Sequence, residues 1–346
     1  MAKSLSQSKS IVIPDNMQNK FWENEYLKLS SLAVTSSTWK CRLSSLNKLK
    51  TFAKSTKTEI MWPLNEKIRN GFIVWCFAKG NVMAKTVDKY LVHLNSIQSF
   101  LGFKKFTKNK SQTKALLKGY ENANVHLNKK PKIRKAITFH MLQDLKEKIR
   151  STISNPILAR TFWCICSFAF FGCFRLGELL TKNKSSFDPD SDLLWKDIKI
   201  YGKSISINLK TQKIDTGYPN KIYLFNFKNK HLCPVRSIKR LKHIQRKKKL
   251  YNKNLPVFRV QKAKFVTQKD INKFLKMSYP DSKVSGHSFR AGIPTSIANF
   301  PELTNDSHAM GWGRWRSKAF KSYQKSKKKQ KKWIFHKIEK ALLAGQ

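Results

Sequence analysis

Four side chains in the second half of the chain could together act on a phosphate. Arg175 lies in FRLGELL, directly after an apolar run, and His287 and Arg290 are three positions apart in GHSFRAG. Tyr323 follows among lysines, and cationic surroundings favour the phenolate that a nucleophile must become. A guanidinium can hold two phosphate oxygens at once. The four residues therefore indicate phosphoryl transfer through a covalent tyrosine intermediate.

Each of these residues also has an ordinary structural interpretation. Arg175 could pair with Glu178 at the edge of an apolar core. His287 and Arg290 could lie on the surface of a basic helix, and Tyr323 could stack on a base. Their combination and order along the chain, rather than any single residue, favour chemistry.

Further candidates lie between these residues. Lys210 ends a predicted strand in the sequence LKT, where a turn could project its ammonium into a cleft, and Lys213 lies on the same loop. Arg314 and Trp315 precede Tyr323 by nine and eight residues. Either of these two side chains could hydrogen-bond a phosphate.

In this order of Arg, Lys, HxxR, Arg/Trp and Tyr, the chain from Ile137 to Phe335 resembles the tyrosine recombinase (phage integrase) family. FRLGELL, GHSFRAG and the GRWRSKAFKSY of residues 313–323 are most similar to the Crypton and DIRS-like recombinases of eukaryotic mobile elements. The family usually has His or Trp nine residues before its nucleophile, where this chain has Arg314 beside Trp315.

The resemblance implies that a recombinase or transposase of a mobile element breaks and rejoins DNA through a 3′-phosphotyrosine at Tyr323. Arg175 and Arg290 would stabilise the phosphorane, and His287 would assist the nucleophile. Lys210, with Lys213 as the alternative, would protonate the leaving 5′ oxygen. Glu178 would support Arg175. No metal, cofactor or ATP is expected, because the arginines replace metal ions and the covalent link conserves the bond energy.

Two other functions of related proteins remain open. A type IB topoisomerase or telomere resolvase uses similar chemistry within one molecule. A DNA-binding relative of the same fold could have lost catalysis, which the arginine at position 314 makes conceivable. Nucleases that use two metal ions need clustered carboxylates, and the few acids of this half lie mainly in one probable loop.

The composition indicates a nucleic-acid partner. The chain of 346 residues has a formal net charge of +50, from 70 Lys and Arg against 20 Asp and Glu. Such a charge repels itself unless a polyanion lies near. A packaging protein of the ribosomal or histone-like kind would have the same charge, because lysine and arginine bind phosphates without reading sequence. The motifs, not the charge, favour double-stranded DNA as a substrate.

The apolar pattern predicts two domains, mainly α-helical with a small antiparallel β-sheet, that form a clamp around DNA. Residues 1–15 are a flexible basic arm, residues 16–127 a helical core-binding domain and residues 128–136 a basic linker. Residues 137–346 form the catalytic domain, which ends in a basic helix and tail.

Within the catalytic domain, the residues from Thr161 to Phe174 are predicted to form a buried helix, since this run is too short to cross a bilayer. Alternating residues predict one strand from Ile198 to Leu209 and a second from Lys221 to Phe225, joined through a loop at Lys210–Asn220. We expect no membrane association.

The sequence also predicts how the protein assembles and where in the cell it is located. The tail after Tyr323 has an apolar face, including Ile338 and Leu342, that we expect to dock on a neighbouring protomer, giving a dimer on each DNA site and a tetrameric synapse. Packing on its own domain is the alternative. The six cysteines lack metal-ligand spacing and are expected to be buried thiols. In a eukaryotic host, the basic clusters would direct the protein to the nucleus; otherwise we expect a DNA-associated intracellular protein.

Overall fold

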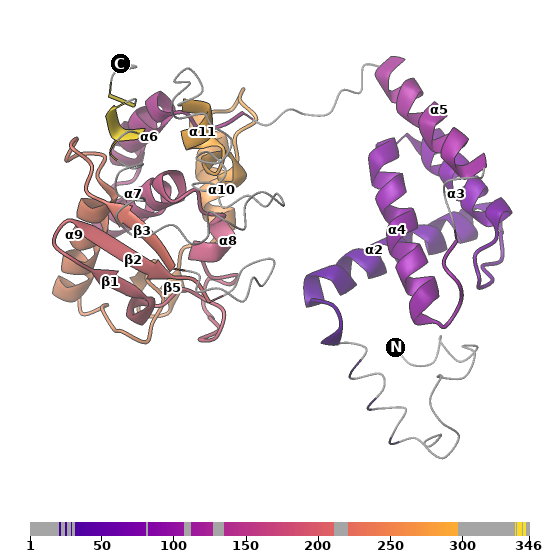
Figure 1. Cartoon of the computed structure of the whole chain (residues 1–346), viewed down its shortest axis with the longest axis horizontal. Helices are drawn as coiled ribbons and strands as arrows, with labels where there is room; N and C mark the ends of the chain where they lie inside the picture. Colours follow the sequence, from indigo (N-terminus) through magenta and orange to yellow (C-terminus); the bar gives the residue numbers. More distant parts are fainter. Residues whose placement is uncertain are drawn as a thin grey trace. The chain divides into compact units, whose positions relative to one another are not determined.

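The computed structural model describes residues 32–80, 82–106, 112–126, 135–210 and 221–296, with isolated positions before and after these ranges. The chain divides into two compact units, Met1–Pro131 and Lys132–Gln346 (Figure 1). The division falls within the predicted linker of residues 128–136, most of which lies outside the described residues. The basic arm of residues 1–15 and the loop of residues 211–220 also lie outside them.

The described part of the first unit is helical, with a core of its own. Two of its helices begin after side chains that accept backbone N–H groups: Thr35 before the first and Asn65 before the second. Phe72, Leu91 and Leu94 are fully buried between the helices. The elements are α2 (Ser36–Thr56), α3 (Glu66–Lys79), α4 (Ala84–Phe100) and α5 (Gln112–His126).

The second unit combines helices with two small antiparallel sheets, so the predicted fold class is confirmed. The larger sheet has the strand order β1-β2-β3, and β4 pairs with β5. The elements are α6 (Phe139–Thr152), α7 (Pro156–Phe171), α8 (Leu176–Leu179), η3 (Trp195–Asp197), β1 (Ile198–Ile200), β2 (Ser204–Asn208), β3 (Lys221–Phe225), α9 (Pro234–Lys247), β4 (Arg259–Gln261), β5 (Lys264–Phe265), α10 (Gln268–Ser278), η4 (Gly286–Phe289) and α11 (Gly292–Ser296).

Helix α7 forms the centre of the second unit, as Figure 1 shows. Asn155 caps it, Pro156 occupies its first turn, and Cys164, Ile165 and Phe168 have no exposed surface. The predicted buried helix is therefore confirmed, although it starts before Thr161. Among the described helices, none has the length and apolarity needed to span a bilayer.

The prediction for the first strand was wrong. Ile198–Leu209 is not one strand but a hairpin, in which Ile200 of β1 faces Ile205 of β2. Tyr201 and Ser204 close the turn through a backbone hydrogen bond of 2.8 Å, and Gly202 lies in this turn. The apolar residues alternate on both sides of the turn, but they shift from even positions (Ile198, Ile200) to odd positions (Ile205, Ile207) across it, a signal that the prediction overlooked. The antiparallel pairing of β2 with β3 agrees with the predicted connection between them.

The cysteine prediction needs one correction. All six cysteines are free thiols, but Cys41 is exposed on α2 whereas the other five are buried. Burial raises the pKa of Cys164 to about 12, so this thiol stays protonated at neutral pH.

The C-terminal helix packs differently from the prediction. Ile338 and Leu342 are each 3% exposed and belong to the core of their own unit, not to a surface presented to a neighbour. Glu339 fixes them there, since its buried carboxylate accepts a hydrogen bond from the backbone N–H of Lys228. This agrees with the alternative of packing within the domain. Docking on a second protomer stays a prediction.

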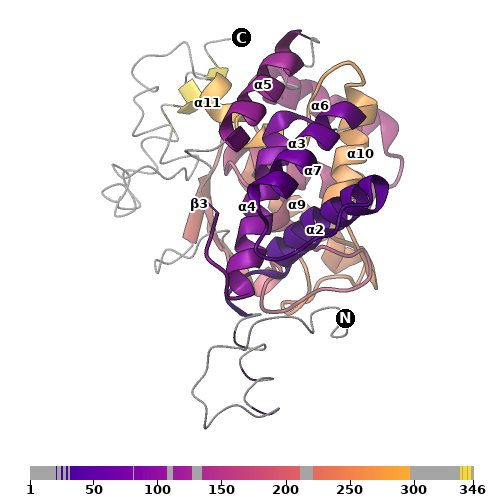
Figure 2. The same cartoon turned by 90° about the vertical axis from the view of Figure 1, so that its right-hand side faces the viewer.

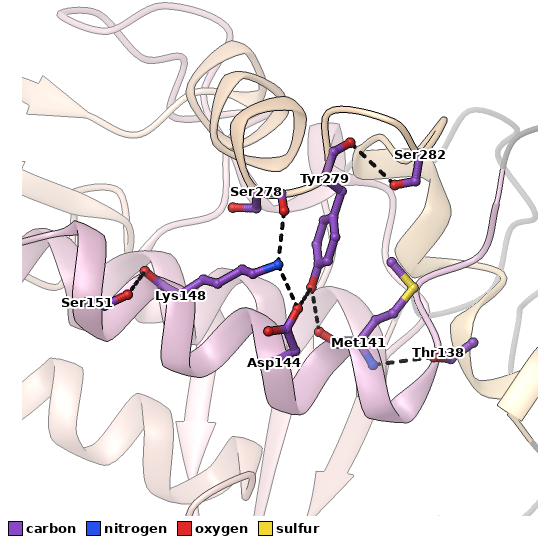
Figure 3. Close-up of polar contacts among 8 residues, drawn as sticks. All are labelled: Thr138, Met141, Asp144, Lys148, Ser151, Ser278, Tyr279 and Ser282. Carbon is purple, nitrogen blue, oxygen red and sulfur yellow. Dashed lines mark hydrogen bonds and ion pairs between the residues drawn. The ribbon is translucent and has the colours of Figure 1, made fainter.

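A polar cluster joins the start of the second unit to the segment that leads into η4. The hydroxyl of Tyr279 is the donor to two acceptors, Asp144 Oδ2 at 2.8 Å and Met141 O at 3.0 Å (Figure 3). Lys148 Nζ contacts Asp144 Oδ2 at 2.9 Å and Ser278 O at 3.0 Å, and it lies 4.2 Å from the centroid of the Tyr279 ring. The cluster therefore ties the end of α10 to α6.

We expect Tyr279→Phe to lower the free energy of unfolding by about 1–2 kcal/mol at neutral pH, because the hydrogen bonds of the hydroxyl to Asp144 and Met141 are lost. Urea denaturation measures the difference. Tyr251→Phe is the matched control, because the Tyr251 hydroxyl has no hydrogen-bond partner among the described residues.

The stability of the wild-type protein and that of Tyr279→Phe should respond differently to alkaline pH. Burial, and then the hydrogen bond to Asp144, raises the pKa of Tyr279. Above pH ~10 the unfolded chain ionises this tyrosine while the folded chain does not, so the wild-type protein loses stability that Tyr279→Phe keeps. The stability difference between them should therefore shrink above pH ~10, and a constant difference would contradict this.

Candidate active site

Arg175 stands at the junction of α7 and α8, where the backbone turns sharply. Gly172 ends α7, and Cys173 has a φ of 46°, in the left-handed region. Arg175 then caps α8: its backbone N–H and its Nη1 both donate to the Glu178 carboxylate, each at 2.9 Å. The predicted Arg175–Glu178 pair therefore forms, with Glu178 at 7% and Arg175 at 39% side-chain exposure. The guanidinium carries further N–H donors for an anion.

Arg290 is held against the same turn from the other end of the sequence. Its side chain is only 3% exposed, and Nη1 donates to the carbonyl of Cys173 at 3.2 Å. A buried guanidinium needs such acceptors, because a charge transferred from water without partners is costly. Arg290 thus contacts Cys173, which is two residues before Arg175, although more than a hundred residues separate the two arginines in the chain.

Gly286 allows η4 to approach α8 closely. A Cβ at this position would lie 2.1 Å from Cδ1 and 2.7 Å from Cγ of Leu176, the residue after Arg175. The Gly286 backbone N–H donates to Asn272 Oδ1 of α10 at 2.7 Å. The segments that carry Arg175 and Arg290 therefore meet at two points, one polar and one apolar.

His287 lies in η4 and is exposed, whereas Arg290 follows η4 and is buried. The motif forms a 3₁₀ turn followed by the short helix α11, not the surface of a basic helix. The chain behind the motif is closely packed: a Cβ at Gly292 would lie 2.5 Å from Ile137 O and 2.6 Å from the Phe170 ring.

Lys210 follows β2, and its ammonium is held by the loop that precedes β1. Nζ contacts Asp197 Oδ2 at 2.9 Å, Pro189 O at 2.7 Å and Asp192 O at 3.0 Å. These contacts match the N–H donors that an ammonium carries. In this arrangement Lys210 anchors the base of the β2–β3 connection, and proton donation to a substrate would require these contacts to break.

The remaining predicted site residues lie outside the described part of the chain. They are Lys213, Arg314, Trp315 and Tyr323. Their roles, including the choice between Lys210 and Lys213 and between Arg314 and Trp315, stay predictions. Within the described ranges, no group of three or more His, Cys, Asp and Glu residues could hold a metal ion.

Sequence reasoning missed three residues that support the site. The carbonyl of Cys173, the amide of Asn272 and the carboxylate of Asp197 hold Arg290, Gly286 and Lys210. A backbone carbonyl leaves no mark on the residue type, and Asn272 lies within an ordinary amphipathic helix. Only Asp197, as an acid in a basic chain, offered a signal.

Comparison with known proteins gives a consistent result. No family model and no curated protein match the sequence. Among solved structures, the XerH site-specific recombinase bound to a palindromic difH substrate has a TM-score of 0.51 and 15% identity, covering 86% of this chain and 78% of that one. The chain has the tyrosine recombinase fold.

Two further structures agree with this assignment. A lambda integrase dimer bound to a COC′ core site has a TM-score of 0.53 and 12% identity, over 88% of this chain and 76% of that one. The Tn1549 transposon integrase in complex with transposon right end DNA has a TM-score of 0.53 and 13% identity, over 87% and 92%. At these identities the likeness shows the fold, and activity must be argued from this chain's own residues.

The contact between η4 and α8 can be tested by a double-mutant cycle. Gly286→Ala should lower the free energy of unfolding by about 1–3 kcal/mol, because the new methyl group overlaps Leu176. In a Leu176→Ala background the same change should cost less, since the obstructing atoms are gone. Urea denaturation of the four proteins gives the coupling.

Gly177→Ala is the control for this cycle, because a Cβ there meets only Gln268 Oε1 at 3.9 Å, an ordinary contact. It should change stability little in either background. Equal costs of Gly286→Ala with and without Leu176 would show that α8 and η4 do not meet in this way.

Proposed function

We propose that this protein cleaves and rejoins DNA strands through a 3′-phosphotyrosyl link at Tyr323. The observation that carries the proposal is the joint between the two arginine motifs, where Arg290 binds the carbonyl of Cys173 and Gly286 packs on Leu176. This joint occurs in a chain with the tyrosine recombinase fold and a net charge of +50.

The proposed reaction is an in-line attack. The Tyr323 oxygen bonds to phosphorus, the bond to the 5′ oxygen breaks, and that oxygen leaves with a proton. Arg175 and Arg290 would neutralise the additional charge on the non-bridging oxygens. His287, exposed on η4, would take the proton of the tyrosine, and Arg314 or Trp315 would hydrogen-bond the phosphate.

Rejoining is the reverse step with another strand. A free 5′ hydroxyl attacks the phosphotyrosine and releases Tyr323, so no nucleotide hydrolysis is required. Permanently charged guanidinium groups would perform the charge neutralisation that metal ions supply in other nucleases, so activity should persist in a chelator. The resemblance of residues 313–323 supports a role as the recombinase of a Crypton-like or DIRS-like mobile element. The protein would assemble as an oligomer on its DNA sites.

A non-cleaving relative of the same fold is the second candidate. The specific observations in its favour are the engagement of Lys210 by Asp197 and two carbonyls, and an arginine at position 314. Such a protein would bind DNA and leave its phosphodiester bonds intact.

Trapping of a covalent adduct separates the two candidates. On a nicked DNA substrate carrying the ends of its own element, the wild-type protein should accumulate an adduct at a 3′ phosphate, and Tyr323→Phe should form none. Arg175→Gln should slow adduct formation by about 10²–10³-fold, because an oriented charge on the transition state is lost. Denaturing gels and mapping of the linked end supply the measurement.

Tyr201→Phe, in the exposed turn between β1 and β2, is the control and should form adduct at the wild-type rate. Adduct formation by Tyr323→Phe would exclude this nucleophile. Binding without any adduct in the wild-type protein would favour the non-cleaving relative, and relaxation of plasmids without exchange between two sites would favour topoisomerase activity.

The general acid can be identified with a substrate whose bridging 5′ oxygen is replaced by sulfur. A thiolate leaves without protonation, so a variant that lacks only the acid recovers its rate on this substrate. Because Lys210 is held by Asp197, we expect Lys210→Met to be slow with both substrates and Asp197→Asn to behave like it. Lys213→Met should recover with sulfur, and recovery of Lys210→Met instead would make Lys210 the acid.

A further inference from the structure

Helix α9 presents only basic side chains to solvent. It runs from Pro234 to Lys247, and each of its exposed positions is an arginine, a lysine or a histidine. We call the lysines and arginines among them the α9 ridge. They are Arg236, Lys239, Arg240, Arg246 and Lys247.

The ridge is held in a fixed orientation by the opposite face of the helix. Val235, Ile238 and Leu241 have no exposed surface. Gln245 is also fully buried: its Nε2 donates to Val257 O (2.9 Å) and Arg259 O (2.8 Å), and its Oε1 accepts from Trp195 Nε1 (2.8 Å). Rotation of α9 would break these bonds, so the basic side chains cannot separate by turning the helix.

Neighbouring elements add more positive charge. Burial, and then the cations Arg236 and Arg160, lower the pKa of Arg240. Burial likewise lowers the pKa of Lys146 on α6; the adjacent Glu147 opposes this shift, and Arg240, Arg150 and Arg236 reinforce it. Like charges are thus gathered from α6, α7 and α9 around one surface.

Acidic residues do not compensate this charge. The sequence has no Asp or Glu between Asp215 and Asp270. Among the described residues, no ion pair includes a side chain of α9, and the first turn of α9 has no acid although Arg236 stands there against the helix dipole. The arrangement opposes stability in the free protein, which is expected of a surface shaped for an anionic partner.

The ridge is separate from the candidate active site. Helix α7 packs against α9 and also against α8 and η4, which adjoin Arg175 and Arg290. In Figure 1, α9 lies at the opposite side of this unit from α8, α10 and α11. Figure 2 views the chain from the right-hand side of Figure 1, so that these elements overlap there. A straight duplex held at the two arginines would not account for this second surface.

We propose that the α9 ridge binds the phosphate backbone of a second DNA duplex, in addition to the duplex at the active site. From Arg236 to Lys247 the ridge spans about 16 Å at the helical rise, and a duplex presents one negative charge for roughly each 1.7 Å of its axis. Several phosphates can therefore be contacted at once, without reading of base sequence.

Other occupants fit less well. A protein partner usually contributes or receives apolar anchors, and the exposed positions of α9 offer none. The basic segment KSKKKQKK of residues 325–332 would be repelled by the ridge. Since the inference extends the proposed function, it also has a use there: strand exchange requires two duplexes to be held together.

The experiment uses the full-length protein saturated with an unlabelled duplex, to which a labelled duplex of random sequence is added. Fluorescence titration gives the affinity for the second duplex and the number bound by each protomer, and repetition over a series of salt concentrations gives the log–log slope. Arg236→Gln/Arg240→Gln/Arg246→Gln should lose the second duplex about tenfold in affinity. The slope should decrease by about 3, one unit for each lost phosphate contact.

Two control sets decide whether position or bulk charge matters. The triple Arg→Lys variant at the same positions keeps the charge and should bind the second duplex within about twofold of wild type. Lys269→Gln/Lys273→Gln/Lys276→Gln removes equal charge from exposed positions of α10 and should also retain the second duplex. Without DNA, the α9 Gln variant should melt at a higher temperature than wild type, because like-charge repulsion is relieved.

Equal losses from the α9 and α10 sets would overturn the proposal, as would wild-type affinity of the α9 Gln variant for the second duplex. The proposal would also be overturned if the α9 Gln variant lost binding to RNA or to an acidic protein but kept its affinity for the second duplex. The outcome is independent of cleavage: adduct formation with Tyr323 tests the proposed function, and the second duplex can bind or fail to bind whichever way that result falls.

Discussion

The hydrogen bond from Arg290 to the carbonyl of Cys173 is the contact on which the arrangement of the second unit depends. It joins the turn between α7 and α8 to the segment after η4, and both segments are then constrained. Cys173 adopts a positive φ, and its carbonyl provides an acceptor for the buried guanidinium. Gly286 completes the joint by removing the Cβ that would otherwise collide with Leu176.

Around this joint, contacts distant in sequence hold the elements in place. The Tyr279–Asp144–Lys148 cluster fixes the end of α10 on α6, just before η4 begins. The backbone N–H of Ile137 donates to Ser288 O at 3.1 Å, so the first residues of the unit pair directly with the HxxR segment. A few cations, such as Arg290 and Lys148, belong to this scaffold. Other positive charge lies on surfaces such as α9, where we propose that it serves DNA binding rather than folding.

Local chemistry explains what could be predicted from the sequence. Thr35, Asn65 and Asn155 cap helices whose apolar spacing is regular, so the helices could be found, and β2 and β3 alternate as paired strands do. The turn at Gly202 was missed, although the glycine and the shift of the apolar positions from even to odd numbers across it marked the turn in the sequence. The contacts of Lys210 were out of reach, since two of its acceptors are backbone carbonyls and the third comes from a different loop. The motifs thus located Arg175 and Arg290, while tertiary structure determined what holds them.

The structural role of Arg290 affects how members of this fold should be compared. Its buried guanidinium binds the carbonyl of a turn that lies more than a hundred residues away in the chain. A relative without catalytic activity would still need this contact to fold. The persistence of an arginine at this position is therefore a poor sign of activity, whereas a solvent-facing residue such as His287, which is exposed, has less structural reason to be retained.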